Sequence, residues 1–92
     1  MATLEQKFGW VVRRLRKRAG IAQEKLADIA GLHRTHIGLI ERGKRGANLQ
    51  VIQKLARALN TSMGKLMNAL EAQGDEPGPE PAGPRPGRPR KQ

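Results

Sequence analysis

The segment Gly31–Gly46, GLHRTHIGLIERGKRG, contains many hydrogen-bond donors for its length. At helical spacing its apolar residues form only a thin seam, which consists of Leu32, Ile37 and Ile40. The Arg, Lys, His and Thr side chains around this seam are groups that bind phosphate oxygens and the acceptors on base edges. One carboxylate, that of Glu41, stands among them. The segment therefore predicts a nucleic-acid-binding helix and leaves the role of its acid to be explained.

The charge of the chain supports a nucleic-acid partner. Of the 92 residues, those numbered 3–73 contain 14 Lys and Arg against 5 Asp and Glu, a net charge of +9. No apolar run approaches the roughly 20 residues of a membrane span, and the N-terminus does not resemble a signal peptide. Cysteine is absent, which excludes disulfides and thiolate metal sites and fits a cytoplasmic, nucleoid-associated protein. The acids form no catalytic set, so we expect neither an enzyme nor a cofactor.

Composition divides the chain into a domain and a tail. All six prolines follow residue 76, and that region has no large apolar residue. Such a segment buries too little surface to offset the entropy lost on ordering. We therefore expect one folded domain over residues 3–73 and a disordered Pro/Gly/Arg-rich tail over residues 74–92. The tail is interpreted either as a basic arm that adds non-specific DNA affinity or as an inert solubilising segment.

The domain is expected to be all-α, because apolar residues recur at helical spacing and nowhere alternate as in a strand. Helix starts are indicated by Thr3, in the capping box TLEQ, and by Asn48 and Ser62. The expected helices span residues 4–19, 23–30, 34–42, 49–59 and 62–73. The fourth helix is expected to bury Leu49, Ile52, Leu55, Ala56 and Leu59.

The second and third helices form a helix-turn-helix motif over residues 23–42. The small Ala27 allows the two helices to approach, and Gly31 supplies the bend between them. Ile37 and Ile40 seat the third helix on the core, so its opposite face projects outward. A protruding helix of this kind fits the major groove of DNA.

These residues resemble the Xre/Cro-repressor family of helix-turn-helix proteins. The resemblance covers residues 15–67 and includes Gln23, the Leu26–Ala27 pair, Gly31, IERGKR and LARAL. It implies a compact five-helix Cro/repressor-like domain. Within the family, GLHRTHIGLIERGKR and the short length are similar to the controller proteins of restriction-modification systems.

The resemblance also implies roles for individual residues. The residues expected to meet base edges are Arg34, Thr35, Gly38 and Leu39. Those expected to contact phosphate are Gln23, His36, Arg42, Lys44 and Arg45. It further implies that Glu41 forms a structural ion pair with Arg16 of the first helix, which accounts for the lone acid. Gly38 interrupts the recognition helix, where its smallness is interpreted as allowing closer approach to DNA, and Leu39 is expected to be exposed.

A sequence-specific regulator of transcription is the function that these observations favour. One recognition helix reads only a few base pairs, so we expect a homodimer on an inverted-repeat operator in double-stranded DNA, with control of its own operon. The expected dimer contact lies on the last helix, at Met63, Leu66, Met67 and Leu70. Two alternatives are the antitoxin of a toxin–antitoxin pair and a protein-binding adaptor of the transcription machinery. His33 and His36 lack further ligands at suitable spacing, so no metal site is expected.

Overall fold

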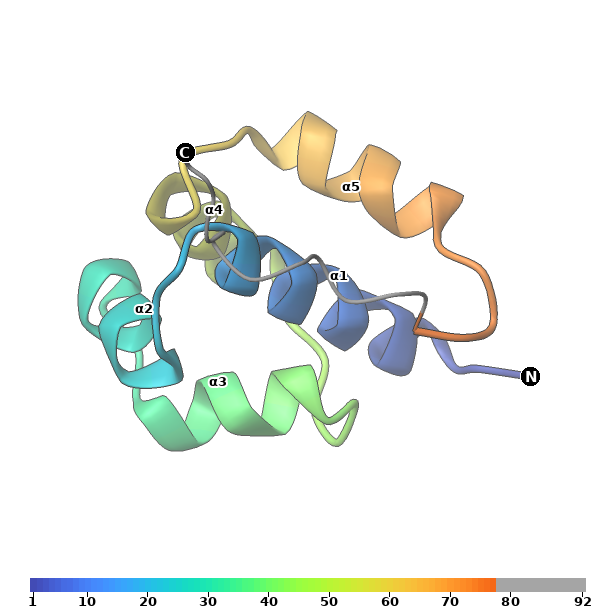
Figure 1. The fold of residues 1–92 in the computed structure, drawn as a ribbon, viewed down its shortest axis with the longest axis horizontal. Coiled ribbons are helices and arrows are strands. Elements are labelled where there is room, and N and C mark those ends of the chain that lie inside the picture. The colour runs from blue at the N-terminus through green and yellow to red at the C-terminus, as the bar shows by residue number, and fades with distance from the viewer. Residues whose placement is uncertain (78–92) are drawn as a thin grey trace, which may run out of the picture.

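Five α-helices form the part of the chain that the computed structural model describes, residues 1–77 (Figure 1). They are α1 (Leu4–Arg18), α2 (Gln23–Ala30), α3 (Arg34–Glu41), α4 (Leu49–Ala58) and α5 (Met63–Ala72). No strand occurs in this part of the chain, which confirms the all-α prediction. None of these helices has the length and apolar character that crossing a membrane requires.

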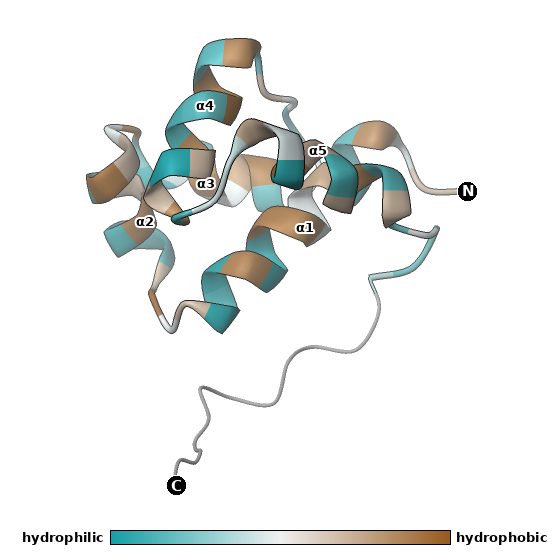
Figure 2. Cartoon of the chain, turned by 90° about the horizontal axis from the view of Figure 1, so that it is seen from above, coloured by the Kyte–Doolittle hydropathy of each residue, from teal (hydrophilic) through white to brown (hydrophobic). Residues whose placement is uncertain are grey.

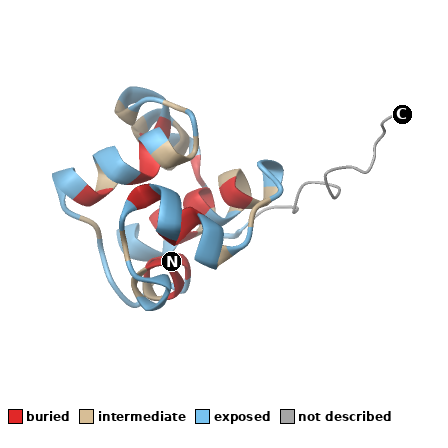
Figure 3. Ribbon diagram, turned by 90° about the vertical axis from the view of Figure 1, so that its left-hand side faces the viewer, coloured by how far each residue is buried: buried red, intermediate tan, exposed pale blue. Residues whose placement is uncertain are grey.

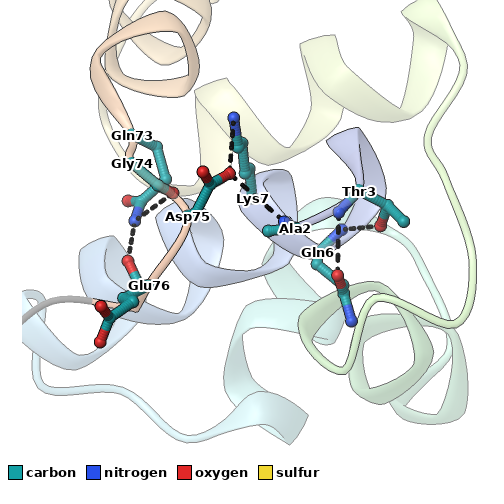
Figure 4. Close-up of polar contacts among 8 residues, drawn as sticks. All are labelled: Ala2, Thr3, Gln6, Lys7, Gln73, Gly74, Asp75 and Glu76. Carbon is teal, nitrogen blue, oxygen red and sulfur yellow. Dashed lines mark hydrogen bonds and ion pairs between the residues drawn. The ribbon is translucent and has the colours of Figure 1, made fainter.

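Side-chain caps begin α1, α4 and α5. The Thr3 hydroxyl accepts a hydrogen bond from the Gln6 amide at 3.0 Å, and the Gln6 side chain accepts one from the Thr3 amide at 2.9 Å (Figure 4). The predicted capping box is therefore present. Asn48 and Ser62 cap α4 and α5 through the amide three residues later. The residues before α2 and α3 provide no side-chain cap, so tertiary packing must hold these two helices in place.

The core lies around α1, which runs between α3 on one side and α5 on the other (Figure 1). Along each helix apolar and polar segments alternate, as in amphipathic helices (Figure 2). Buried residues gather where the helices face one another (Figure 3). The core cluster consists of Phe8, Val11, Val12, Leu26, Ala27, Ile37, Ile40, Val51, Leu55, Ala56 and Leu66.

The buried face of α4 differs from the expected one at its start. Leu49 is 74% exposed, whereas Val51 is 8% exposed and belongs to the core. Val51 stands one turn before the fully buried Leu55, so these two residues share the face that meets the other helices. Leu49 is the first residue of α4 and lies at the edge of that face. The prediction that Leu49 is buried was therefore wrong.

The crossing of α1 and α3 depends on Gly9. A Cβ atom on Gly9 would overlap the carbonyl oxygen of Ile40 and lie 2.7 Å from that of Glu41. The backbones of the two helices therefore touch at this point. A second close approach occurs just beyond α3, where a Cβ on Gly43 would lie 2.6 Å from Cγ of Gln6. The first turns of α1 thus fix the end of α3.

The four residues after α5, Gln73 to Glu76, fold back onto α1 and are called here the C-terminal clasp (Figure 4). Gln73 accepts a hydrogen bond from Arg14 at 2.8 Å and donates one to the Glu76 carbonyl at 2.6 Å. The Asp75 carboxylate lies 3.5 Å from the Lys7 ammonium and accepts from the Ala2 amide at 3.3 Å. The predicted tail begins within this clasp, and its residues 78–92 lie outside the described residues.

Gly9→Ala should destabilise the domain, because the new methyl group would push against backbone atoms that cannot rotate away. We expect a loss of about 3 kcal/mol in the free energy of unfolding, at the upper end of typical overpacking costs. Gly64→Ala is the matched control, since its Cβ would meet nothing closer than the Ser62 hydroxyl at 3.9 Å. Urea unfolding followed by circular dichroism measures both variants. Equal midpoints for the two would contradict the close crossing.

Candidate nucleic-acid interface

The turn between α2 and α3 projects α3 away from the rest of the domain. Gly31 adopts a left-handed conformation with φ of 71°, and the Leu32 amide donates to the Ala27 carbonyl at 2.9 Å. Ile37 and Ile40 are fully buried and anchor α3 against α1 and α2. On the opposite face of α3, Arg34, Thr35 and Arg42 are exposed. In Figure 1, α3 accordingly runs along one edge of the molecule.

A buried polar network joins α1, α2 and α3 behind this face. Glu41, which is 6% exposed, accepts hydrogen bonds from Arg16 Nε at 2.6 Å and from Arg16 Nη2 at 3.0 Å. The third guanidinium nitrogen of Arg16 donates to the Ile21 carbonyl at 2.8 Å. Gln23 Nε2 donates to Glu41 at 3.0 Å. Glu41, the lone acid of the segment, thus forms a bidentate ion pair with Arg16, the partner that the family resemblance implied.

The outward face of α3 contains a polar hollow of about 240 Å³, called here the α3 hollow. It is lined by Gln23, Arg34, Thr35, Gly38 and Arg42, which brings together three residues expected at base edges and two expected at phosphate. Because Gln23 uses its NH₂ group on Glu41, its side-chain oxygen remains as an acceptor near the hollow. Gly38 is buried beneath neighbouring side chains, with Arg42 Nη1 lying 3.2 Å from where its Cβ would be.

Leu39, the fourth residue expected at base edges, is half-buried rather than exposed. The loop after α3 folds back at this point, where the Lys44 amide donates to the Leu39 carbonyl at 2.9 Å. The expected exposure of Leu39 was therefore wrong. Lys44 and Arg45 themselves lie exposed in the loop just beyond the end of α3.

His36 lies at the flank of α3 and is half-buried. Its pKa is lowered from the ordinary histidine value by burial first, then by the positive charge of Arg45 and by His33. The imidazole is therefore neutral at pH 7, and it offers one N–H donor and one acceptor rather than a cation. Any phosphate contact by His36 at this pH would be a hydrogen bond without a full charge.

The four residues expected at a dimer contact differ in how far they are buried. Leu66 is fully buried within the single chain, so it offers no surface to a partner and is removed from the predicted contact. The helix that carries it, α5, packs against α1 and α4. Met63, Met67 and Leu70 are half-buried at the edge of the core. Met67 and Leu70 also line an apolar groove of about 200 Å³ whose other apolar side chains are Leu4, Phe8, Ala47 and Ile52.

Comparison with known proteins identifies related chains. The helix-turn-helix family profile matches residues 12–66. Control protein C.SmaI of Serratia marcescens is 50% identical over 56 residues, which are 61% of this chain and 67% of that protein. Control protein C.BamHI of Bacillus amyloliquefaciens is 42% identical over 62 residues, 66% of this chain and 76% of that one.

Two solved structures have the same architecture. The restriction-modification controller protein C.AhdI from Aeromonas hydrophila superposes with a TM-score of 0.66 at 44% identity, over 67% of this chain and 94% of that chain. The controller protein C.Esp1396I, solved as a tetramer in complex with its natural 35 base-pair operator, gives a TM-score of 0.71 at 28% identity. That match covers 78% of this chain and 95% of the other.

Glu41→Ala should lower the free energy of unfolding by about 3–5 kcal/mol, since it leaves the Arg16 guanidinium buried without its counter-charge. The control is Lys7→Ala, which breaks the more exposed pair with Asp75 and should cost about 1 kcal/mol or less. Thermal and urea unfolding measure the difference. If the two variants unfold alike, the buried network does not hold α3.

Proposed function

The chain belongs to the helix-turn-helix family, and from this premise we propose that it is a sequence-specific DNA-binding regulator of transcription of the restriction-modification controller type. The observation that carries the proposal is the α3 hollow, whose donors face outward because the only acid of α3 is buried against Arg16. The similarity to control proteins C.SmaI and C.BamHI, and the operator complex of C.Esp1396I, support the same function. Such a regulator acts at the nucleoid and needs no catalytic group.

We assign base reading to Arg34 and Thr35 at the start of α3. Both are exposed, and both stand at the end of the helix that enters the groove first in this class of motif. The guanidinium of Arg34 can bond O6 and N7 of one guanine together. Leu39 contributes less than the sequence suggested, because part of its side chain is covered. Lys44 and Arg45, beyond the end of α3, suit phosphate contacts that position the protein without reading sequence.

Two copies of the chain bind the operator in this proposal, because one recognition helix covers too few base pairs for specificity. We assign the two-fold contact to the apolar groove at Met67 and Leu70, because it is an apolar surface that a second copy can cover. Leu4, at the rim of this groove, is 64% exposed and is available to enter the groove of the partner. Control of the chain's own operon is part of the controller-type proposal.

The first experiment distinguishes residues that contact base edges from residues that contact phosphate. Arg34→Ala should weaken binding to a duplex selected from a randomised library by about 1–3 kcal/mol and relax selectivity at one base pair per half-site. Lys44→Ala should weaken selected and scrambled duplexes alike, and reduce the salt dependence by about one counterion per subunit. Fluorescence anisotropy over a salt series measures both.

The adaptor alternative predicts a different outcome for the same experiment. If the wild-type chain shows no preference for any selected duplex, or if both variants lose equal affinity for both duplexes, α3 does not read bases. A protein partner would then be the better explanation for the exposed face of α3.

The second experiment tests the dimer contact. Leu4→Asp places a charge at the rim of the apolar groove and should raise the dimer dissociation constant about tenfold or more, as judged by sedimentation. Ile29→Asp is the matched control, since Ile29 is also exposed, at 52%, but lies on α2 away from the groove. Dimers of equal strength in both variants would rule out this face.

A further inference from the structure

The side chain of Arg42 extends back along α3 toward the N-terminus of that helix. Its Nη1 and Cζ atoms lie 3.2 and 3.8 Å from the place that a Cβ of Gly38 would occupy, one helical turn earlier. Helical side chains lean toward the N-terminus of their helix, and the missing side chain at Gly38 lets this one lie flat along the preceding turn. The guanidinium group of Arg42 therefore lies beside the middle of α3, although the residue itself follows the last residue of the helix.

Arg42 also belongs to the outermost stripe of α3. It follows Thr35 by two helical turns, so the two residues share one face. Ile37 and Ile40, both fully buried, mark the opposite face. Base edges are met mainly by the N-terminal part of a recognition helix, and the path of the Arg42 side chain takes its guanidinium back toward that part.

The α3 hollow is polar and has two arginines in its lining, so it suits a group that presents hydrogen-bond acceptors. The side chain of Arg42 makes no hydrogen bond or ion pair within residues 1–77, and Arg42 lines the hollow together with Arg34. A group with hydrogen-bond acceptors that enters the hollow would meet the guanidinium of Arg42, whose side chain has no partner of its own in the described residues. In the major groove the group that presents two adjacent acceptors is the edge of guanine, with O6 and N7.

We propose that Arg42 reads a guanine as a second base-reading residue beside Arg34, through space that Gly38 keeps open. This assignment replaces the phosphate contact that the family resemblance implied for Arg42. It rests on the proposed function, because it requires that α3 enter the major groove.

The test uses the full chain and the selected duplex, in which each guanine is replaced in turn by 7-deazaguanine to remove its N7 acceptor. The wild-type chain should lose about tenfold in affinity at the guanine read by Arg42 and at the one read by Arg34. Arg42→Ala should become insensitive at the first of these positions and stay sensitive at the second. Lys44→Ala should keep both sensitivities, because it changes only affinity.

Gly38→Ala supplies an independent measurement. Its melting temperature should rise, since Ala is the better helix former, while its methyl group displaces the guanidinium of Arg42. It should therefore lose the same positional sensitivity as Arg42→Ala, and the double variant should lose nothing further at that position.

Two negative results are distinguishable. If the wild-type chain binds selected and scrambled duplexes equally, the proposed function and this inference both fail. If the wild-type chain discriminates but Arg42→Ala keeps every guanine sensitivity and weakens all duplexes by one factor, only the inference fails, and Arg42 is a phosphate contact.

Discussion

A single buried ion pair, between Arg16 of α1 and Glu41 of α3, holds together every segment that orients the α3 hollow. Through Arg16 it reaches the α1–α2 loop at the Ile21 carbonyl, and through Glu41 it reaches Gln23 at the start of α2. A buried pair of this kind adds little net stability compared with apolar packing, but it is directional. Its contribution here is geometry, because four segments must keep one arrangement for all its hydrogen bonds to form together.

The same pair sets the electrostatics of the interface. An exposed carboxylate on α3 would repel DNA and attract Arg34 or Arg42 to itself. Burying that carboxylate behind the helix removes both effects, and it leaves the cations of the outward face without an internal partner in the described residues. The backbone contact at Gly9 adds rigidity to this arrangement, since α3 has no room to shift toward α1. The interface is therefore preorganised from inside the domain.

Local signals in the sequence were sufficient for the helices, and tertiary contacts explain what the sequence left out. Capping at Thr3 and at Asn48 depends on backbone amides three residues away, so the sequence predicts both caps. The burial of Leu66 and the exposure of Leu49 depend on which helix covers which face. Periodicity identifies an apolar face, but it does not say whether another chain or the same chain covers it.

Among the interface residues, too, local spacing predicts some positions, whereas others depend on tertiary contacts. Spacing on α3 predicted that Arg34 and Thr35 point outward, and the structure has them exposed. The path of Arg42 over Gly38 was not predictable, because it depends on the space left by a missing side chain one turn away. Likewise, the sequence offers no sign that Gly9 meets the backbone of α3, since a glycine within a helix has no distinctive spacing.

The C-terminal clasp brings the two ends of the helical unit to one place, where Asp75 meets both Lys7 and the amide of Ala2. In a chain shortened to residues 1–77, a short linker from Pro77 to Met1 would accordingly close a ring at small entropic cost, with all five helices left where they are. Reopening that ring at the exposed turn around Asn60 would yield a circular permutant that begins with α5. In such a permutant α2 and α3 stay consecutive. The position of the chain ends would then change, while the α3 surface would stay the same.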